Sequence, residues 1–175
     1  MAQFTIRPSQ ALEALLRVTM KGMVPYMQGP PGIGKSDIVR QLAEKGNLKV
    51  IDIRLSQAMP EDLNGFPMKN ADGTKASFIP FDVFPIQGDA LPVRPDGTPY
   101  AGWLIFLDEL SSAPKAVQAA AYKLILDRMV GSYHLHDNVV MVAAGNRMGD
   151  KAVVVEQSTA LRSRLTHLEL EYSQP

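Results

Sequence analysis

A glycine-rich stretch near the N-terminus constrains the fold of this chain more than any other feature. Residues 29–36 match the pattern G-x-x-x-x-G-K-[ST] at every fixed position and read Gly29, Pro30, Pro31, Gly32, Ile33, Gly34, Lys35 and Ser36. In this pattern the glycines let backbone N–H groups point at phosphates, and the lysine reaches the β and γ phosphates. The stretch predicts a nucleoside triphosphate site, because a plain surface turn needs glycines but no following Lys-Ser pair.

The residues around this loop agree with that interpretation. An apolar run, residues 24–27, precedes the loop, and a helical pattern, residues 37–43, follows it. Strand, loop and helix are the context that the motif requires. We therefore expect the nucleotide to be bound by residues 29–37, that is, by the loop and Asp37 directly after it. We expect the Ser36 hydroxyl to bind Mg²⁺, a hard cation that prefers oxygen ligands.

Composition is that of an ordinary globular chain. Its 175 residues suit one domain, residues 1–175, and no Cys is present for disulfide or thiol chemistry. Eighteen basic and eighteen acidic residues cancel, so the charge balance argues for neither nucleic acid nor a membrane surface. No apolar run approaches the ~20 residues of a spanning helix, and the N-terminus lacks the features of a leader. We expect a cytoplasmic protein.

Apolar runs alternate with helical patterns along the chain. Strands are expected over residues 50–55, 103–109, 139–146 and 166–170, and helices over residues 9–21 and 158–163. A further helix is expected after Ser111 or Ser112 as its cap, with Pro114 in its first turn. Between residues 59 and 103 the chain is dense in Pro and Gly, with turn signals at 72–73 and 96–97, and no helix is expected there. The alternation predicts an α/β domain with a mostly parallel sheet and a ligand crevice at the carboxyl ends of its strands.

Two carboxylates follow the apolar strand that ends near residue 108. Asp108 and Glu109 are adjacent, and at a frayed strand end both can reach the crevice. Phosphoryl transfer needs little beyond positioned charge. We expect Asp108 to hold Mg²⁺ opposite Ser36, and Glu109 to orient and polarise the attacking water.

The chain resembles the AAA+ ATPases, and more closely their MoxR-like and dynein-related branch. The resemblance rests on segments that read as Walker A (residues 29–36), Walker B (104–109), a sensor 1 strand (143–146) and an arginine-finger region (160–165). It implies a three-layer P-loop NTPase fold with five strands in the order 5-1-4-3-2. In that order Asn146 lies between Lys35 and Glu109, where it can bond the γ phosphate or the water.

The same resemblance implies a ring, usually a hexamer, in which one subunit's arginine completes its neighbour's site. Arg162 and Arg164 are the two candidates, and on a helix residues two apart point ~200° away from each other. We favour Arg164, because the finger in the family precedes an apolar residue at the start of a strand, here Leu165. The small helical lid of the family is not found before Pro175, so either the sequence is truncated or the lid is absent.

The function implied is an ATPase that uses ATP and Mg²⁺ as a chaperone or remodelling motor on a protein partner, often one with a von Willebrand factor type A domain. A DNA-associated ATPase, such as a helicase loader, is an alternative that calls for a basic face. A GTP-dependent switch is another, but it needs an N-K-x-D guanine reader. The nearest match starts at Asn146 and has Gly149 where the Asp must stand.

Overall fold

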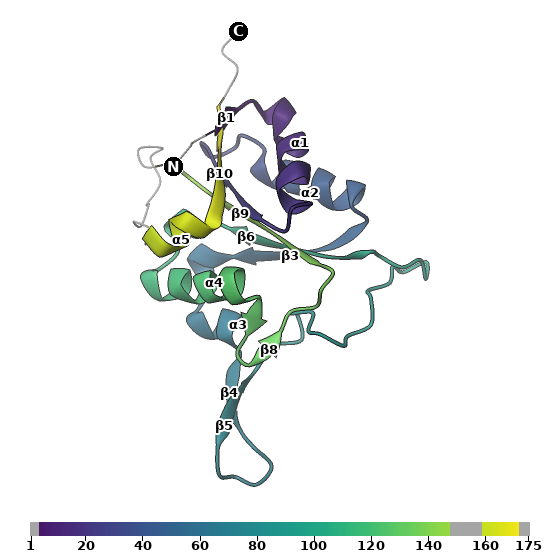
Figure 1. The fold of residues 1–175 in the computed structure, drawn as a ribbon, viewed down its shortest axis with the longest axis vertical. Coiled ribbons are helices and arrows are strands. Elements are labelled where there is room, and N and C mark those ends of the chain that lie inside the picture. Colours follow the sequence, from purple (N-terminus) through teal and green to yellow (C-terminus); the bar gives the residue numbers. More distant parts are fainter. Residues whose placement is uncertain (1–3, 148–158, 172–175) are drawn as a thin grey trace.

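The computed structural model describes residues 4–147 and 159–171 and shows a three-layer α/β fold (Figure 1). The middle layer is a six-stranded sheet, in the order β1-β10-β2-β9-β6-β3, and every neighbouring pair is parallel. Its strands are β1 (Phe4–Ile6), β2 (Val24–Gln28), β3 (Leu48–Arg54), β6 (Gly102–Asp108), β9 (Val139–Gly145) and β10 (Leu165–Leu170). All six carboxyl ends therefore meet at one edge of the sheet.

The expected strand order is confirmed, but the expected number of strands is wrong. Strands β10, β2, β9, β6 and β3 lie in the order 5-1-4-3-2, and β1 adds a sixth strand outside β10. Phe4 lies opposite Leu168 and Ile6 opposite Leu170 in this added pair. Three residues are too few to show a strand periodicity, so only pairing with β10 reveals β1.

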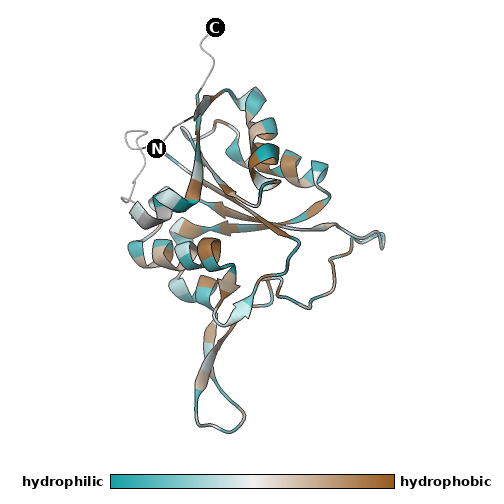
Figure 2. Ribbon diagram, in the orientation of Figure 1, coloured by the Kyte–Doolittle hydropathy of each residue, from teal (hydrophilic) through white to brown (hydrophobic). Residues whose placement is uncertain are grey.

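Helices cover both faces of the sheet. Helices α1 (Pro8–Thr19) and α2 (Lys35–Lys45) lie on one face, and α3 (Pro60–Asn64) and α4 (Lys115–Asp127) lie on the other (Figure 1). Successive side chains of β6 alternate between the two cores: Leu104 and Phe106 pack with α1 and α2, whereas Ile105 and Leu107 pack with α4. The apolar strands of Figure 2 thus run between two separate cores, as an internal parallel sheet requires.

Helix α4 begins later than the sequence indicates. Leu110–Ser112 form a 3₁₀ turn, and Pro114, expected in the first helical turn, is the N-cap residue. Ala113 is extended, at φ −72° and ψ 144°, because a residue before proline is disfavoured in the helical region. The expectation that Ser111 or Ser112 caps this helix is therefore wrong.

The Pro- and Gly-rich region holds more regular structure than expected. It contains α3 and a hairpin of β4 (Phe66–Lys69) and β5 (Ala76–Ile79), which projects from the body of the molecule at the bottom of Figure 1. The turn expected at residues 72–73 closes this hairpin, where the Thr74 N–H donates to Asp72 Oδ1 at 3.0 Å. Most side chains of the hairpin are exposed on both faces, so the sequence carries no alternation that identifies strands.

A second hairpin, of β7 (Met129–Val130) and β8 (Tyr133–His134), follows α4, and the six-residue helix α5 (Thr159–Arg164) precedes β10. The turn expected at residues 96–97 is also present, with the Thr98 N–H 2.9 Å from Asp96 Oδ1. None of the helices within the described ranges has both the length and the apolarity to span a membrane.

Candidate nucleotide site at the carboxyl edge of the sheet

The phosphate loop joins the end of β2 to the start of α2. Gly32 and Gly34 have φ of +77° and +91°, in the left-handed region that side chains disfavour, so glycine is required at both turns. Ile33 between them is buried and anchors the loop on the core of α1 and α2. The first turn of α2, which includes Ser36, then points its backbone N–H groups toward the loop, the arrangement that binds anions.

Lys35 directs its ammonium group back over the loop. Its Nζ lies 2.7 Å from the Gly29 carbonyl oxygen, 3.1 Å from that of Pro30 and 3.2 Å from Asn146 Oδ1. An ammonium group has three donor protons, and these three oxygens suit them. Asn146, expected between Lys35 and Glu109, thus lies at the ammonium group of Lys35, although the two residues are 111 positions apart in the sequence.

Asp37 is placed differently from the other residues expected at the nucleotide. Its carboxylate accepts a hydrogen bond from Arg40 Nη1 at 2.7 Å, on the exposed outer face of α2. A negative side chain in the first turn still favours the helix through the macrodipole. Any contact of Asp37 with a phosphate therefore falls to its backbone N–H.

The Asp108 carboxylate lies at the end of β6, partly buried beside the phosphate loop. Burial raises the pKa of Asp108 above its ordinary value, and the negative charges of Asp52 and Glu109 raise it further. A hydrogen bond from the Glu109 N–H, 2.8 Å from Oδ1, lowers the pKa, as does the positive charge of Lys35. A partly buried carboxylate near the positive charge of Lys35 suits a divalent cation, because the cation offsets the penalty that burial places on the carboxylate charge.

Glu109 turns away from the strand direction. Its φ of 57° is left-handed, a conformation that costs a non-glycine residue of order 1–3 kcal/mol and that clusters at functional sites. The Glu109 carboxylate accepts a hydrogen bond from the Ser56 hydroxyl, just beyond the end of β3. Sequence reasoning missed Ser56, because its only signal is a polar residue after an apolar strand.

Asn146 follows β9, which lies between the loop strand β2 and the acidic strand β6, as expected. Its backbone N–H donates to Ser111 Oγ at 2.8 Å, and Ser111 is 2% exposed. Ser111 thus supports Asn146 instead of capping α4, a role that requires β6 and β9 to be neighbours. Met148 and Gly149, the other half of the rejected guanine reader, and Ser158, the expected helix start, lie outside the described residues.

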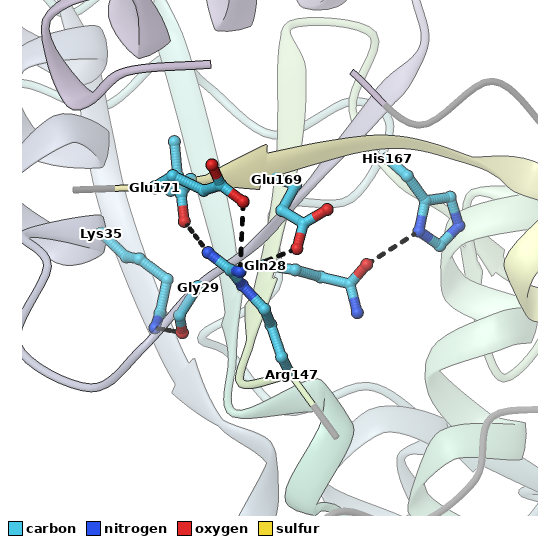
Figure 3. A network of polar contacts seen from close by, with 8 residues as sticks. Gln28, Gly29, Lys35, Arg147, His167, Glu169 and Glu171 are labelled. Atoms are coloured by element: carbon cyan, nitrogen blue, oxygen red, sulfur yellow. Dashed lines mark hydrogen bonds and ion pairs between the residues drawn. The ribbon is translucent and has the colours of Figure 1, made fainter. Parts of the chain in front are cut away.

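Helix α5 presents both arginine candidates at the surface. Arg162 and Arg164 are exposed, and Arg164 is the last helical residue before the buried Leu165. The ring of His167 on β10 links this helix to the end of β2: Nε2 lies 2.9 Å from the Arg162 carbonyl oxygen. Its Nδ1 lies 3.3 Å from Oε1 of Gln28, the residue immediately before the first loop glycine (Figure 3).

A phosphate loop after the central strand β2, acids after β6 and a polar residue after β9 define the P-loop NTPase class of α/β proteins. Residues 26–165 match the AAA domain family of the dynein-related subfamily. That match covers most of the chain, and the chain belongs to this family.

Solved structures support the fold. A candidate ATPase from Cytophaga hutchinsonii superposes with a TM-score of 0.62 at 18% identity, covering 95% of this chain and 46% of that one. RuvB from Thermotoga maritima, described as a Holliday junction branch migration motor, has a TM-score of 0.56 at 20% identity, covering 95% and 45%. NtrX from Brucella abortus has a TM-score of 0.54 at 14% identity, covering 96% and 37%. The chain thus spans less than half of each of these structures. No curated protein matches the chain significantly.

Proposed function

We propose that this chain is the nucleotide-binding core of a MoxR-like ATPase, one domain over residues 1–175, which uses Mg²⁺ and ATP to remodel a protein partner. The observation that carries the proposal is the contact of Lys35 Nζ with Asn146 Oδ1 at 3.2 Å, beside the acidic end of β6. It brings a phosphate-binding cation and a polar amide to one point. A group that both residues touch there is the terminal phosphate of a nucleotide bound on the loop.

Each residue of the site has a proposed role in hydrolysis. Backbone N–H groups of residues 29–37 hold the phosphates, and Lys35 neutralises the β and γ phosphates once it exchanges the loop carbonyls for them. Ser36 and Asp108 offer the oxygen ligands for Mg²⁺, which supplies charge stabilisation when bound. Glu109 orients the attacking water and takes its proton, and Asn146 bonds the γ phosphate or the water.

A ring of subunits is proposed because the two candidate finger arginines of this chain are exposed at its surface. Within the described residues, Arg162 and Arg164 lie on the exposed helix α5. An arginine on that surface reaches a neighbouring subunit's phosphate, as fingers supplied in trans do. We assign this role to Arg164 and propose a homo-hexamer.

The partner proposed is a protein, of the type that carries a von Willebrand factor type A domain. The balanced net charge supports a protein over nucleic acid. The likeness to RuvB extends to the fold alone at 20% identity, so it gives no separate support for work on DNA.

Mixing two defective subunits tests the ring and the finger together. Arg164→Ala subunits keep an intact phosphate loop, and Lys35→Ala subunits cannot hold the nucleotide but still present Arg164. Each variant alone is expected to lose on the order of 10³–10⁵ in turnover or to lose it entirely, and their mixture is expected to recover activity. The parent's specific activity is expected to rise with protein concentration, measured as phosphate release.

Two outcomes contradict the proposal in different ways. If the mixture stays inactive while the parent assembles and turns over, Arg164 is not the finger, and Arg162→Ala replaces it in the same test. If the dilute parent turns over at a rate independent of concentration, the ring itself is wrong.

A further inference from the structure

Arg147 joins the ends of two strands that are not neighbours. It directly follows Asn146, yet its Nη1 lies 2.9 Å from Glu169 Oε1 and 3.5 Å from Glu171 Oε1 at the end of β10. Its Nη2 also donates to the Leu170 carbonyl (Figure 3). Because β2 lies between β9 and β10, the side chain of Arg147 crosses the end of β2, where the phosphate loop begins.

Gly29, at the start of the phosphate loop, packs against Leu170 at the end of β10. A Cβ on Gly29 would lie 3.1 Å from both Leu170 Cβ and the Leu170 carbonyl oxygen, closer than most side chains tolerate. On its other side, the Gly29 N–H donates to the Gly145 carbonyl at 3.3 Å. Gly29 is therefore enclosed between the ends of β9 and β10, and the Leu170 carbonyl touches both the loop and Arg147.

The ion pair of Arg147 with Glu169 is less exposed to water than the surface pair of Arg17 with Glu13. The side chains of Arg147 and Glu169 are 27% and 16% exposed, whereas the Arg17–Glu13 pair on α1 is 77% and 70% exposed. An exposed ion pair holds its two side chains only weakly in one geometry, because water competes for both charges. A planar guanidinium that bonds a carboxylate and a carbonyl in a partly buried setting is held in one orientation.

We propose that Arg147 is a positioning residue for ATP hydrolysis, which acts by holding Asn146 in place above the phosphate loop. Ser111 holds the N–H of Asn146 on one side, and the anchored Arg147 holds the backbone on the other. The amide of Asn146 then stays on Lys35, where the γ phosphate and the water meet. This inference rests on the proposed role of Asn146 in hydrolysis.

The experiment compares Arg147→Ala, Arg147→Lys, Asn146→Ala and the double variant Arg147→Ala/Asn146→Ala, with Arg17→Ala as the matched control. Arg147→Ala is expected to lower kcat about tenfold while the Kd for a fluorescent ATP analogue stays within about twofold, because misplacing a catalytic group slows chemistry without removing binding contacts. Arg147→Lys is expected to fall between Arg147→Ala and the parent, since an ammonium cannot bond both acceptors as a fork. Arg17→Ala is expected to match the parent.

The double variant separates positioning from general support of the fold. If Arg147 acts through Asn146, the Arg147→Ala change lowers kcat by less than about twofold once Asn146 is already alanine. An undiminished loss in that background overturns the proposal, as does a variant that unfolds at lower temperature but keeps the parent's kcat. If Asn146→Ala itself keeps the parent's kcat, the proposed role of Asn146 fails instead.

Hydrogen exchange gives a readout that needs no turnover. In the folded Arg147→Ala chain, amides of residues 144–147 are expected to exchange faster than in the parent, and those of β3 are expected to be unchanged. Equal exchange at residues 144–147 in the two chains overturns the proposal whatever the enzyme activity is. Glu169→Gln, which keeps the carbonyl contact and removes one charge, is expected to give a smaller increase than Arg147→Ala.

Discussion

The candidate site has two halves that the chain builds in different ways. The phosphate-loop half is one continuous segment, residues 29–37, shaped by its own glycines and by the helix that follows. The half that we propose to be catalytic is assembled from strand ends: Ser56 meets Glu109 across 53 positions, and Ser111 meets Asn146 across 35 positions. The first half is set by local geometry, whereas the second exists only when the strands lie in the right order.

Substitutions in the two halves of the site should affect different quantities. A loop that is organised locally should bind phosphate as long as its own residues are intact. The assembled half should be sensitive to residues that belong to no motif, because such residues hold the catalytic groups at the right place. Binding and turnover should therefore be separable in this chain.

One residue from each half tests whether ATP binding and turnover are separable. Lys35→Ala is expected to abolish ATP binding, because the loop loses its only charge clamp on the β and γ phosphates. Glu109→Gln is expected to bind ATP as the parent does while turnover falls by on the order of 10²–10⁴, the usual contribution of a positioned base. Equilibrium binding of a fluorescent ATP analogue and phosphate release measure the two effects. If Glu109→Gln binds no nucleotide, or Lys35→Ala binds as tightly as the parent, the two halves are assigned wrongly.

A smaller effect is expected at Ser56, which no motif indicates. Ser56→Ala removes the hydrogen bond that orients the Glu109 carboxylate, so kcat should fall about three- to tenfold with ATP binding unchanged. Ser77→Ala, on the exposed hairpin, serves as the control and should leave both quantities unchanged. An increase in kcat for Ser56→Ala would show that Ser56 holds Glu109 away from the water.

The smallest effect concerns stability at Asp108. Its pKa is raised in the folded chain, mainly by burial, so the folded state favours the protonated acid. Such a group stabilises the fold below its unfolded pKa and loses that contribution as pH rises through its folded pKa. At neutral pH without Mg²⁺ or nucleotide, Asp108→Asn should therefore raise Tm.

Tm measured at several pH values, and with Mg²⁺ and ATP added, supplies the controls for the Asp108→Asn comparison. The gain in Tm for Asp108→Asn should shrink as the pH is lowered toward the range where the parent's carboxyl is protonated. Adding Mg²⁺ and ATP should stabilise the parent more than the variant, because the variant lacks one of the proposed metal ligands. An Asp108→Asn chain that is less stable than the parent at neutral pH would show that the carboxylate contributes to the fold.

Sequence patterns predicted the parts of this protein that depend on neighbours along the chain. The loop motif, the continuous apolar strands β6 and β9 and the acids after β6 are local patterns, and the structure has all of them. The order of the five main strands followed from the resemblance that these patterns carry. Residue types at fixed spacing predict such features, because backbone geometry and the period of two along a strand act over a few residues.

The side chains that support the proposed catalytic groups could be identified only once the strands were placed in the sheet. Strand β1 is identified by its pairing with β10, and Ser111 is a partner of Asn146 because β6 and β9 are adjacent. Arg147 reaches Glu169 because β2 alone separates β9 from β10. Periodicity along a chain says which face a residue occupies, but a contact between distant strand ends depends on the sheet order and on side-chain reach, and these are set when the sheet assembles.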